Sequence, residues 1–296
     1  MTDQSPESYK ISVHCKREDR ESIEAIFEDA LFPAPFSLAS FEATPDGENW
    51  CIEAWFLDMP DKGECAQLFG AWEWSISPVL QQNWVERSLR PLDPVVAGRF
   101  YVYGSHDGPD AAPQDKIALK IDAGMAFGTG HHETTSGCLE AISLLHKSIN
   151  PRNILDLGCG TGLLGIGAAK LWRDAALTLS DIDPDATNFT RASVVDNGLN
   201  GKPGLAIITA NGLIHPGLKA RAPYDLIIAN ILAAPLVRLA PALCHSLSGQ
   251  SHDRLVLSGL LVKQEQMVLS AYLPFGLTVS HRIRQGEWSC LVLSRK

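Results

Sequence analysis

The chain has 296 residues, of which 45% are hydrophobic and 20% are charged, a composition typical of a soluble globular protein with about two domains. The formal net charge of -9 disfavours direct nucleic-acid binding. The sequence contains no run of about 18 apolar residues, the length that a membrane-spanning helix needs, and the start MTDQSPESYK lacks a signal-peptide pattern. The seven cysteines never occur in C-x-x-C spacing, so we expect a cytoplasmic protein with reduced thiols and no metal site.

The acidic residues are concentrated toward the N-terminus. Residues 1–93 hold 18 Asp and Glu against 7 Lys and Arg, whereas residues 94–296 hold 16 against 18. Such acidity can serve solubility alone, or it can steer a basic partner toward the protein. The sequence leaves both interpretations open.

Six elements are predicted in the first 80 residues. Apolar alternation and helical periodicity predict, in chain order, a strand at Tyr9–His14, a helix at Glu18–Ala30, strands at Leu38–Ala43 and Trp50–Leu57, a helix at Lys62–Trp72 and a strand at Trp74–Val79. The order βαββαβ is typical of a small ferredoxin-like α+β domain.

A change of pattern follows this domain. Gly, Pro, Asp and Ser dominate GSHDGPDAAPQD at 104–115, which predicts a loop or linker. We therefore expect a substrate-recognition domain over 1–95, a linker over 96–118 and a second domain over 119–296.

Strands alternate with helices in the second domain, which predicts a parallel sheet of the Rossmann-like α/β class. The predicted strands are Asn153–Leu157, Leu177–Asp181, Ala206–Thr209, Leu226–Ala229, Arg254–Ser258, Thr278–Ile283 and Trp288–Ser294. The predicted helices are Leu163–Trp172, Asp183–Asn197, Pro235–His245 and Lys263–Tyr272. Only four residues, RQGE, join the last two strands, so these two must be antiparallel.

A glycine-rich loop lies between the first strand and the first helix of this series. In ILDLGCGTGLLGIG (154–167), Gly158, Gly160 and Gly162 allow a tight turn and close backbone approach, and the following helix offers unpaired N–H groups to a ligand. The same segment also fits the G-x-G-x-x-G pattern of dinucleotide-binding proteins. This pattern alone does not distinguish a nicotinamide cofactor from another nucleoside cofactor.

Three features favour a different cofactor. Asp156 precedes the loop by two residues, the fourth strand of the Rossmann-like series ends in the polar pair Ala229-Asn230, and an antiparallel hairpin closes the chain. This combination resembles the class I methyltransferases that use S-adenosyl-L-methionine. The resemblance implies that Asp181, 23 residues after Gly158, binds the ribose hydroxyls of the cofactor.

Five motifs in the same order resemble the PrmA family of ribosomal protein methyltransferases. They are MAFGTGHHETT (125–135), DLGCGTG (156–162), DIDPDA (181–186), ANILAAPL (229–236) and LSGLL (257–261). The resemblance implies that Thr135, Gly158, Asp181 and Asn230 contact the cofactor, with Gly160 and Gly162 in the same loop. It also implies methylation of lysine and N-terminal amines of large-subunit ribosomal protein L-eleven, up to trimethylation.

Methyl transfer to an amine does not require a dedicated catalytic base, and the sequence identifies none. A lysine amine must lose its proton before it attacks the sulfonium methyl group, and both desolvation and the nearby positive charge lower its pKa. No catalytic base is therefore assigned. We expect a monomer that binds the ribosomal protein and neither nucleic acid nor membrane.

Other functions stay open at this stage. A lysine methyltransferase of the same lineage could act on another protein, such as an electron-transfer flavoprotein subunit. A NAD-linked oxidoreductase and a non-catalytic cofactor-binding scaffold are further alternatives. Adjacent histidines such as His131 and His132 cannot easily converge on one ion, so GTGHHETT is expected to be a glycine-hinged loop rather than a metal site.

Overall fold

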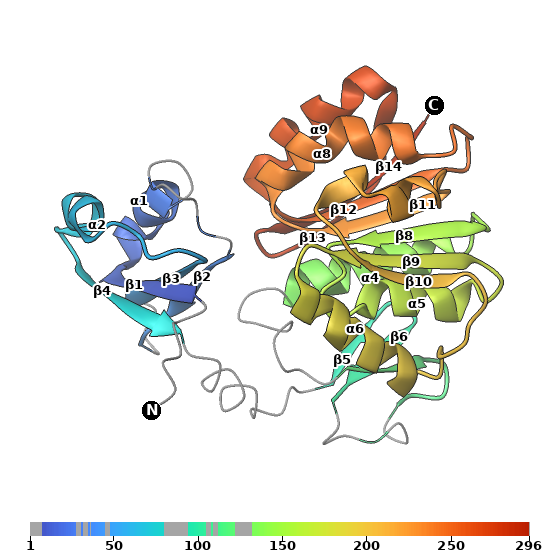
Figure 1. Cartoon of the computed structure of the whole chain (residues 1–296), viewed down its shortest axis with the longest axis horizontal. Coiled ribbons are helices and arrows are strands. Elements are labelled where there is room, and N and C mark those ends of the chain that lie inside the picture. The colour runs from blue at the N-terminus through green and yellow to red at the C-terminus, as the bar shows by residue number, and fades with distance from the viewer. Residues whose placement is uncertain are drawn as a thin grey trace. The chain divides into compact units, whose positions relative to one another are not determined.

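In the computed structural model the chain forms two compact units, divided near residue 90 (Figure 1). Each unit has its own hydrophobic core. The structure describes residues 8–27, 31, 35, 37–44, 48–79, 94–104, 108, 112–121 and 132–295. Within these ranges no helix is long and apolar enough to span a membrane.

The N-terminal unit is a four-stranded antiparallel sheet with two helices. Its elements are β1 (Ser8–Lys16), α1 (Arg20–Ala25), β2 (Ser37–Glu42), β3 (Asn49–Phe56), α2 (Lys62–Phe69) and β4 (Glu73–Val79). The strand order β2-β3-β1-β4 is that of the ferredoxin-like fold, which confirms the prediction. The first helix differs in detail, because Arg17–Asp19 form a separate 3-10 turn, η1, before α1 begins.

Apolar side chains from the strands and the helical segments form the core of this unit. Ile11 and Val13 of β1 are fully buried, and Phe27 lies 4.6 Å from Phe69 between ring centroids. Ile11 and Val13 lie two residues apart and so share one face of the sheet, and they belong to the same buried cluster as Phe27 and Phe69 from the helical segments.

The segment expected as a linker is in part a small sheet of the second unit. Strands β5 (Val95–Ala97), β6 (Phe100–Tyr103) and β7 (Ile117–Lys120) pair in the order β5-β6-β7. Phe100 and Leu119 are fully buried against Gly167, and the Arg99 N–H donates to Ser143 Oγ at 2.9 Å. The loop composition of 104–115 concealed these short apolar strands on either side of it.

The second unit contains a seven-stranded sheet flanked by helices (Figure 1). Its strands are β8 (Asn153–Leu157), β9 (Ala176–Asp181), β10 (Leu205–Thr209), β11 (Leu226–Asn230), β12 (Arg254–Leu261), β13 (Leu277–Gln285) and β14 (Trp288–Arg295). The longer helices are α4 (His132–Leu145), α5 (Leu163–Leu171), α6 (Pro184–Asp196), α8 (Ala233–Ser246) and α9 (Glu265–Tyr272), and α7 (Pro216–Lys219) is a single turn.

The strand order is β10-β9-β8-β11-β12-β14-β13. The five strands from β10 to β12 are parallel to their neighbours, whereas β14 is antiparallel to both β12 and β13. The predicted Rossmann-like sheet with an antiparallel C-terminal hairpin is therefore confirmed. From β8 the chain continues to one side through β9 and β10 and then to the other side through β11 and β12, so the strand order reverses between β8 and β11. Sheets of this class bind ligands at such a reversal, at the carboxyl ends of the strands.

Candidate active site

The glycine-rich loop turns sharply between β8 and α5. Gly158, Gly160 and Gly162 have φ values of 70°, 53° and 80°, which only glycine adopts readily. The N–H groups of Gly158 and Cys159 both donate to Ser180 O at the end of β9, at 2.7 and 3.0 Å. These bonds hold the loop against the carboxyl end of β9.

Asp181, the last residue of β9, connects this loop to the next one. Its Oδ2 accepts the N–H of Gly160 at 2.8 Å, and its Oδ1 accepts the N–H of Asp183 at 3.1 Å. The side chain is only partly buried, so each oxygen keeps a lone pair for a further donor. Asp183, by contrast, caps α6 by accepting the Asp185 N–H at 2.8 Å.

Gly162 has a different role from the other two motif glycines. It is buried at the start of α5, and a Cβ there would lie 3.0 Å from Thr190 Cγ2 of α6. The Thr190 hydroxyl also donates to Gly160 O at 2.7 Å. Gly162 therefore allows α5 and α6 to pack closely, while Gly158 and Gly160 are partly exposed at the edge of the sheet.

Thr135 and Asn230 come together from distant parts of the chain. Asn230 ends β11, and its Nδ2 donates to Thr135 Oγ1 in the first turn of α4 at 3.4 Å. The Oδ1 atom of Asn230 is buried and has no hydrogen-bond partner among the residues that the structure describes. A buried carbonyl oxygen with a free lone pair is suited to accept a hydrogen bond from a ligand N–H or O–H.

A serine in the motif LSGLL fixes α4 at this position. Ser258 Oγ lies 3.3 Å from Thr134 O and 3.2 Å from Ser289 O, so this one hydroxyl links β12 to α4 and β14. The sequence assigned no residue role within this motif. The available signal was Gly259, because a glycine inside a strand often marks a bulge or a close backbone approach. Residues 128–131 of GTGHHETT, including His131, lie outside the described residues, as does the side chain of His132.

Asp156 lies fully buried below the glycine loop. Its Oδ2 accepts the Gly165 N–H at 2.8 Å, whereas its Oδ1 has no hydrogen-bond partner in the described ranges. Burial raises the pKa of this carboxyl from about 3.8 to about 7, although the Gly165 hydrogen bond opposes the change. The carboxyl is therefore protonated in the folded protein at pH values where it is ionised in the unfolded chain.

This raised pKa predicts a pH-dependent stability. Below pH 4 the carboxyl is protonated in both states, and between about pH 4 and 7 only the unfolded chain releases its proton, so stability is lost as the pH rises. Relative to Asp156→Asn, the native chain should lose up to about 1.4 kcal/mol of unfolding free energy per pH unit. Urea denaturation of both chains from pH 4 to 8 measures this difference, and parallel pH profiles would contradict it.

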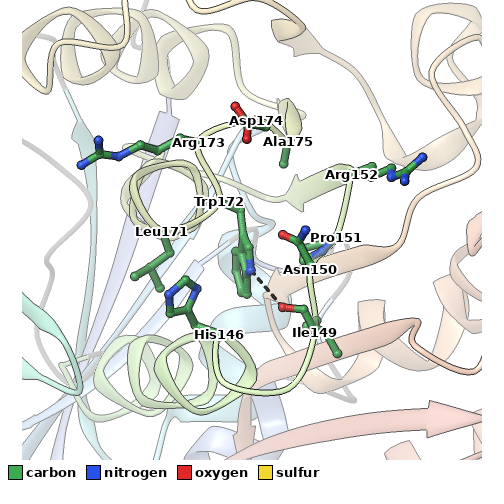
Figure 2. A pocket seen from close by; sticks show the side chains of 10 residues that line it. All are labelled: His146, Ile149, Asn150, Pro151, Arg152, Leu171, Trp172, Arg173, Asp174 and Ala175. Atoms are coloured by element: carbon green, nitrogen blue, oxygen red, sulfur yellow. Dashed lines mark hydrogen bonds between the residues drawn. The ribbon is translucent and has the colours of Figure 1, made fainter.

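A separate cavity of about 600 Å³ lies at the amino ends of β8 and β9, at the other end of these strands from the glycine loop. Figure 2 shows the residues that line it. It lies between the segment that precedes β8 and the segment that joins α5 to β9, and the Trp172 indole N–H donates to Ile149 O across it at 3.2 Å. Cofactors of this fold class bind at the carboxyl ends of the strands. The cavity therefore lies away from the end of the sheet where Asp181 and Asn230 lie.

One group of metal-ligand residue types also lies at that opposite end. Within the described residues, Asp225, His252 and Asp253 bring candidate ligand atoms within 4.8 Å of one another. The Asp225 carboxylate accepts two backbone N–H groups through Oδ2, and Asp253 accepts two through its Oδ2 and a serine hydroxyl through its Oδ1. These hydrogen bonds hold the loops that precede β8 and β12 in place.

The sheet order, the glycine loop and the acid at the end of the second strand together define a methyltransferase of the Rossmann-like class. The family model for ribosomal protein L11 methyltransferase (PrmA) matches residues 8–296. The chain therefore belongs to the PrmA family of methyltransferases, as its motifs predicted, and family membership does not favour an oxidoreductase or a scaffold.

Individual relatives agree with this assignment. The ribosomal protein L11 methyltransferase of Bradyrhizobium diazoefficiens is 39% identical over 279 residues, which cover 91% of each chain. That of Rhizobium rhizogenes is 45% identical over 214 residues, covering 72% of this chain and 71% of the relative. The solved ribosomal protein L11 methylase of Lactobacillus delbrueckii subsp. bulgaricus is 25% identical with a TM-score of 0.59, covering 69% of this chain and all of that one.

Proposed function

We propose that this enzyme transfers methyl groups from S-adenosyl-L-methionine to lysine and N-terminal amines of ribosomal protein L11 in the cytoplasm. The observation that carries the proposal is the buried Oδ1 of Asn230, which has no partner within the described part of the chain and lies beside Thr135 and near the glycine loop. The names of the relatives supply the substrate, and they do not favour another protein such as an electron-transfer flavoprotein subunit.

The described residues fit the cofactor. Gly158 and Gly160 leave backbone exposed at the loop, and Asp181 has lone pairs available to accept hydrogen bonds from two ribose hydroxyls. Thr135 lies in the first turn of α4, where a hydroxyl and backbone N–H groups favour a carboxylate. Bound there, S-adenosyl-L-methionine supplies an activated methyl group on a sulfonium.

The acceptor amine must be neutral when it attacks. Asn230 Oδ1 can accept one amine N–H, which orients the nitrogen while its lone pair stays free. A neutral amide oxygen holds an ammonium less strongly than a carboxylate does, so it does not oppose loss of the proton. A free lysine has a pKa near 10.4 and an α-amine about 7.7–8.0, so the chain must favour the uncharged form chiefly by excluding water.

The N-terminal unit is proposed to dock the substrate. Its charge is strongly negative, whereas ribosomal proteins that bind RNA are basic, so the two surfaces attract. The loop from β3 to α2 combines this acidity with exposed apolar side chains, because Leu57 is 70% and Met59 47% exposed beside Asp58 and Asp61. An exposed apolar pair within an acidic surface is suited to protein binding.

Direct transfer tests the proposal. The purified enzyme, labelled cofactor and ribosomal protein L11 should give label on that protein, with mass increases in multiples of one methyl group on lysine and N-terminal amines. Incubation with a lysate from cells lacking the enzyme should label the same band. Label on another protein and none on L11 would overturn the proposed substrate, and no label on any protein would overturn protein methylation.

A further inference from the structure

Ile231, the first residue after β11, lies between two glycines from separate segments. A Cβ on Gly158 would overlap the Cγ2 methyl of Ile231, so this methyl lies directly over the bare Cα of the glycine loop. On the other side, a Cβ on Gly259 would lie 2.7 Å from the carbonyl carbon and 3.0 Å from the nitrogen of Ile231. Contacts this short exclude any residue but glycine at 259 unless the backbone moves.

The backbone of β12 is shaped for this contact. The pairing of β12 with β14 shifts register between Leu257 and Leu260, which marks a bulge, and Gly259 within it has a φ of 81°. The Ile231 N–H donates to Ser258 O at 3.1 Å just before the bulge. The bulge therefore holds the backbone of Ile231, while the side chain of Ile231 contacts the glycine loop.

This arrangement joins the two halves of the proposed site. Asn230, which is proposed to hold the acceptor amine, is the residue immediately before Ile231. Gly158, which is proposed to approach the cofactor, lies under the Ile231 side chain. The Ile231 side chain is therefore a contact between these two halves in addition to the direct pairing of β8 with β11.

We propose that Ile231 is a positioning residue, which sets the separation between the acceptor amine and the cofactor by its Cγ2 contact with Gly158 and its backbone contact with Gly259. The inference rests on the proposed function. An in-line displacement requires reacting atoms about 3–3.5 Å apart, and a displacement of about 1 Å can cost 100-fold in rate. A side chain of equal size but different branching should therefore reduce the rate without preventing folding.

A matched pair of substitutions isolates the Cγ2 methyl. Ile231→Leu keeps the volume and removes the branch at Cβ, whereas Ile231→Val keeps the branch and removes the terminal methyl. We expect Ile231→Leu to lower kcat at least about tenfold with Kd for S-adenosylhomocysteine within about threefold of the native value, and Ile231→Val to lower kcat much less. Equal kcat in the two variants, or native kcat in Ile231→Leu, would overturn the proposal.

A control separates positioning from packing. Ile227 is fully buried in β11 within the same hydrophobic core that Ile231 borders. Ile227→Leu should lower the melting temperature at least as much as Ile231→Leu while leaving kcat near the native value. If kcat falls in proportion to stability in both variants, Ile231 is only a packing residue and the inference fails.

A second measurement needs no methyl transfer. Gly158→Ala should weaken S-adenosylhomocysteine binding at least about tenfold, and adding Ile231→Ala should restore part of that loss because the overlapping methyl is gone. Ile231→Ala should restore nothing in Gly259→Ala, where the overlap is with backbone atoms. Absence of restoration in the Gly158 pair would overturn the contact even if L11 proves not to be the substrate, whereas an unlabelled L11 contradicts only the proposed function.

Discussion

Replacing Asp181 by alanine is expected to raise the Kd for S-adenosylhomocysteine at least about 100-fold, the largest effect of any single substitution at the proposed site. The carboxylate is proposed to accept two ribose hydroxyls, and hydrogen bonds to a charged group contribute about 1.5–3 kcal/mol each. It also accepts the Gly160 N–H at 2.8 Å, so its removal loosens the glycine loop. Isothermal titration with S-adenosylhomocysteine measures the change.

Asp183→Ala is the matched control for that experiment. This neighbouring carboxylate accepts the Asp185 N–H at the start of α6, and loss of such a cap costs about 1 kcal/mol of stability. Asp183→Ala should therefore lower the melting temperature and leave the Kd for S-adenosylhomocysteine within about threefold of the native value. An Asp181→Ala chain that binds the cofactor as well as the control does would contradict the assignment of Asp181.

Removal of the N-terminal unit is expected to lower kcat/KM for ribosomal protein L11 at least about 100-fold while cofactor binding persists. The truncated chain should begin at Pro91, because a start at residue 96 removes Val95, which pairs with Val102 in β5 and β6. The methyltransferase unit keeps its own hydrophobic core, which supports independent folding. Titration with S-adenosylhomocysteine and thermal unfolding establish that the truncated chain is folded.

The charge of the N-terminal unit gives a finer test in the full chain. Attraction between exposed charges is screened beyond about 10 Å at 0.1 M salt, so kcat/KM for L11 should fall as ionic strength rises. Asp58→Asn together with Glu73→Gln, both exposed in the N-terminal unit, should reduce that salt dependence without altering Kd for the cofactor. Undiminished methylation by the truncated chain, or a rate independent of salt, would contradict docking by this unit.

The elements of both units were predictable because their signals are local. Alternating and helical apolar patterns predicted the order of elements in each unit, and known connection rules then allowed few sheet arrangements. The positive-φ turns at Gly158 and Gly160 follow from glycine chemistry alone. The short strands β5 to β7 were missed because each has only three or four residues, too few for a periodic pattern to stand out from the surrounding loops.

The amino-acid sequence by itself determined the type of fold, the position of the glycine loop and the acid at the end of β9, since each depends on neighbours within a few residues. Only the tertiary structure brought Thr135 to Asn230 across 95 positions, buried the Asn230 amide oxygen with no partner among the described residues, and placed Ile231 between Gly158 and Gly259. Those contacts depend on how strands pack side by side and on a bulge in β12, and close packing of distant segments leaves no periodic trace in the chain.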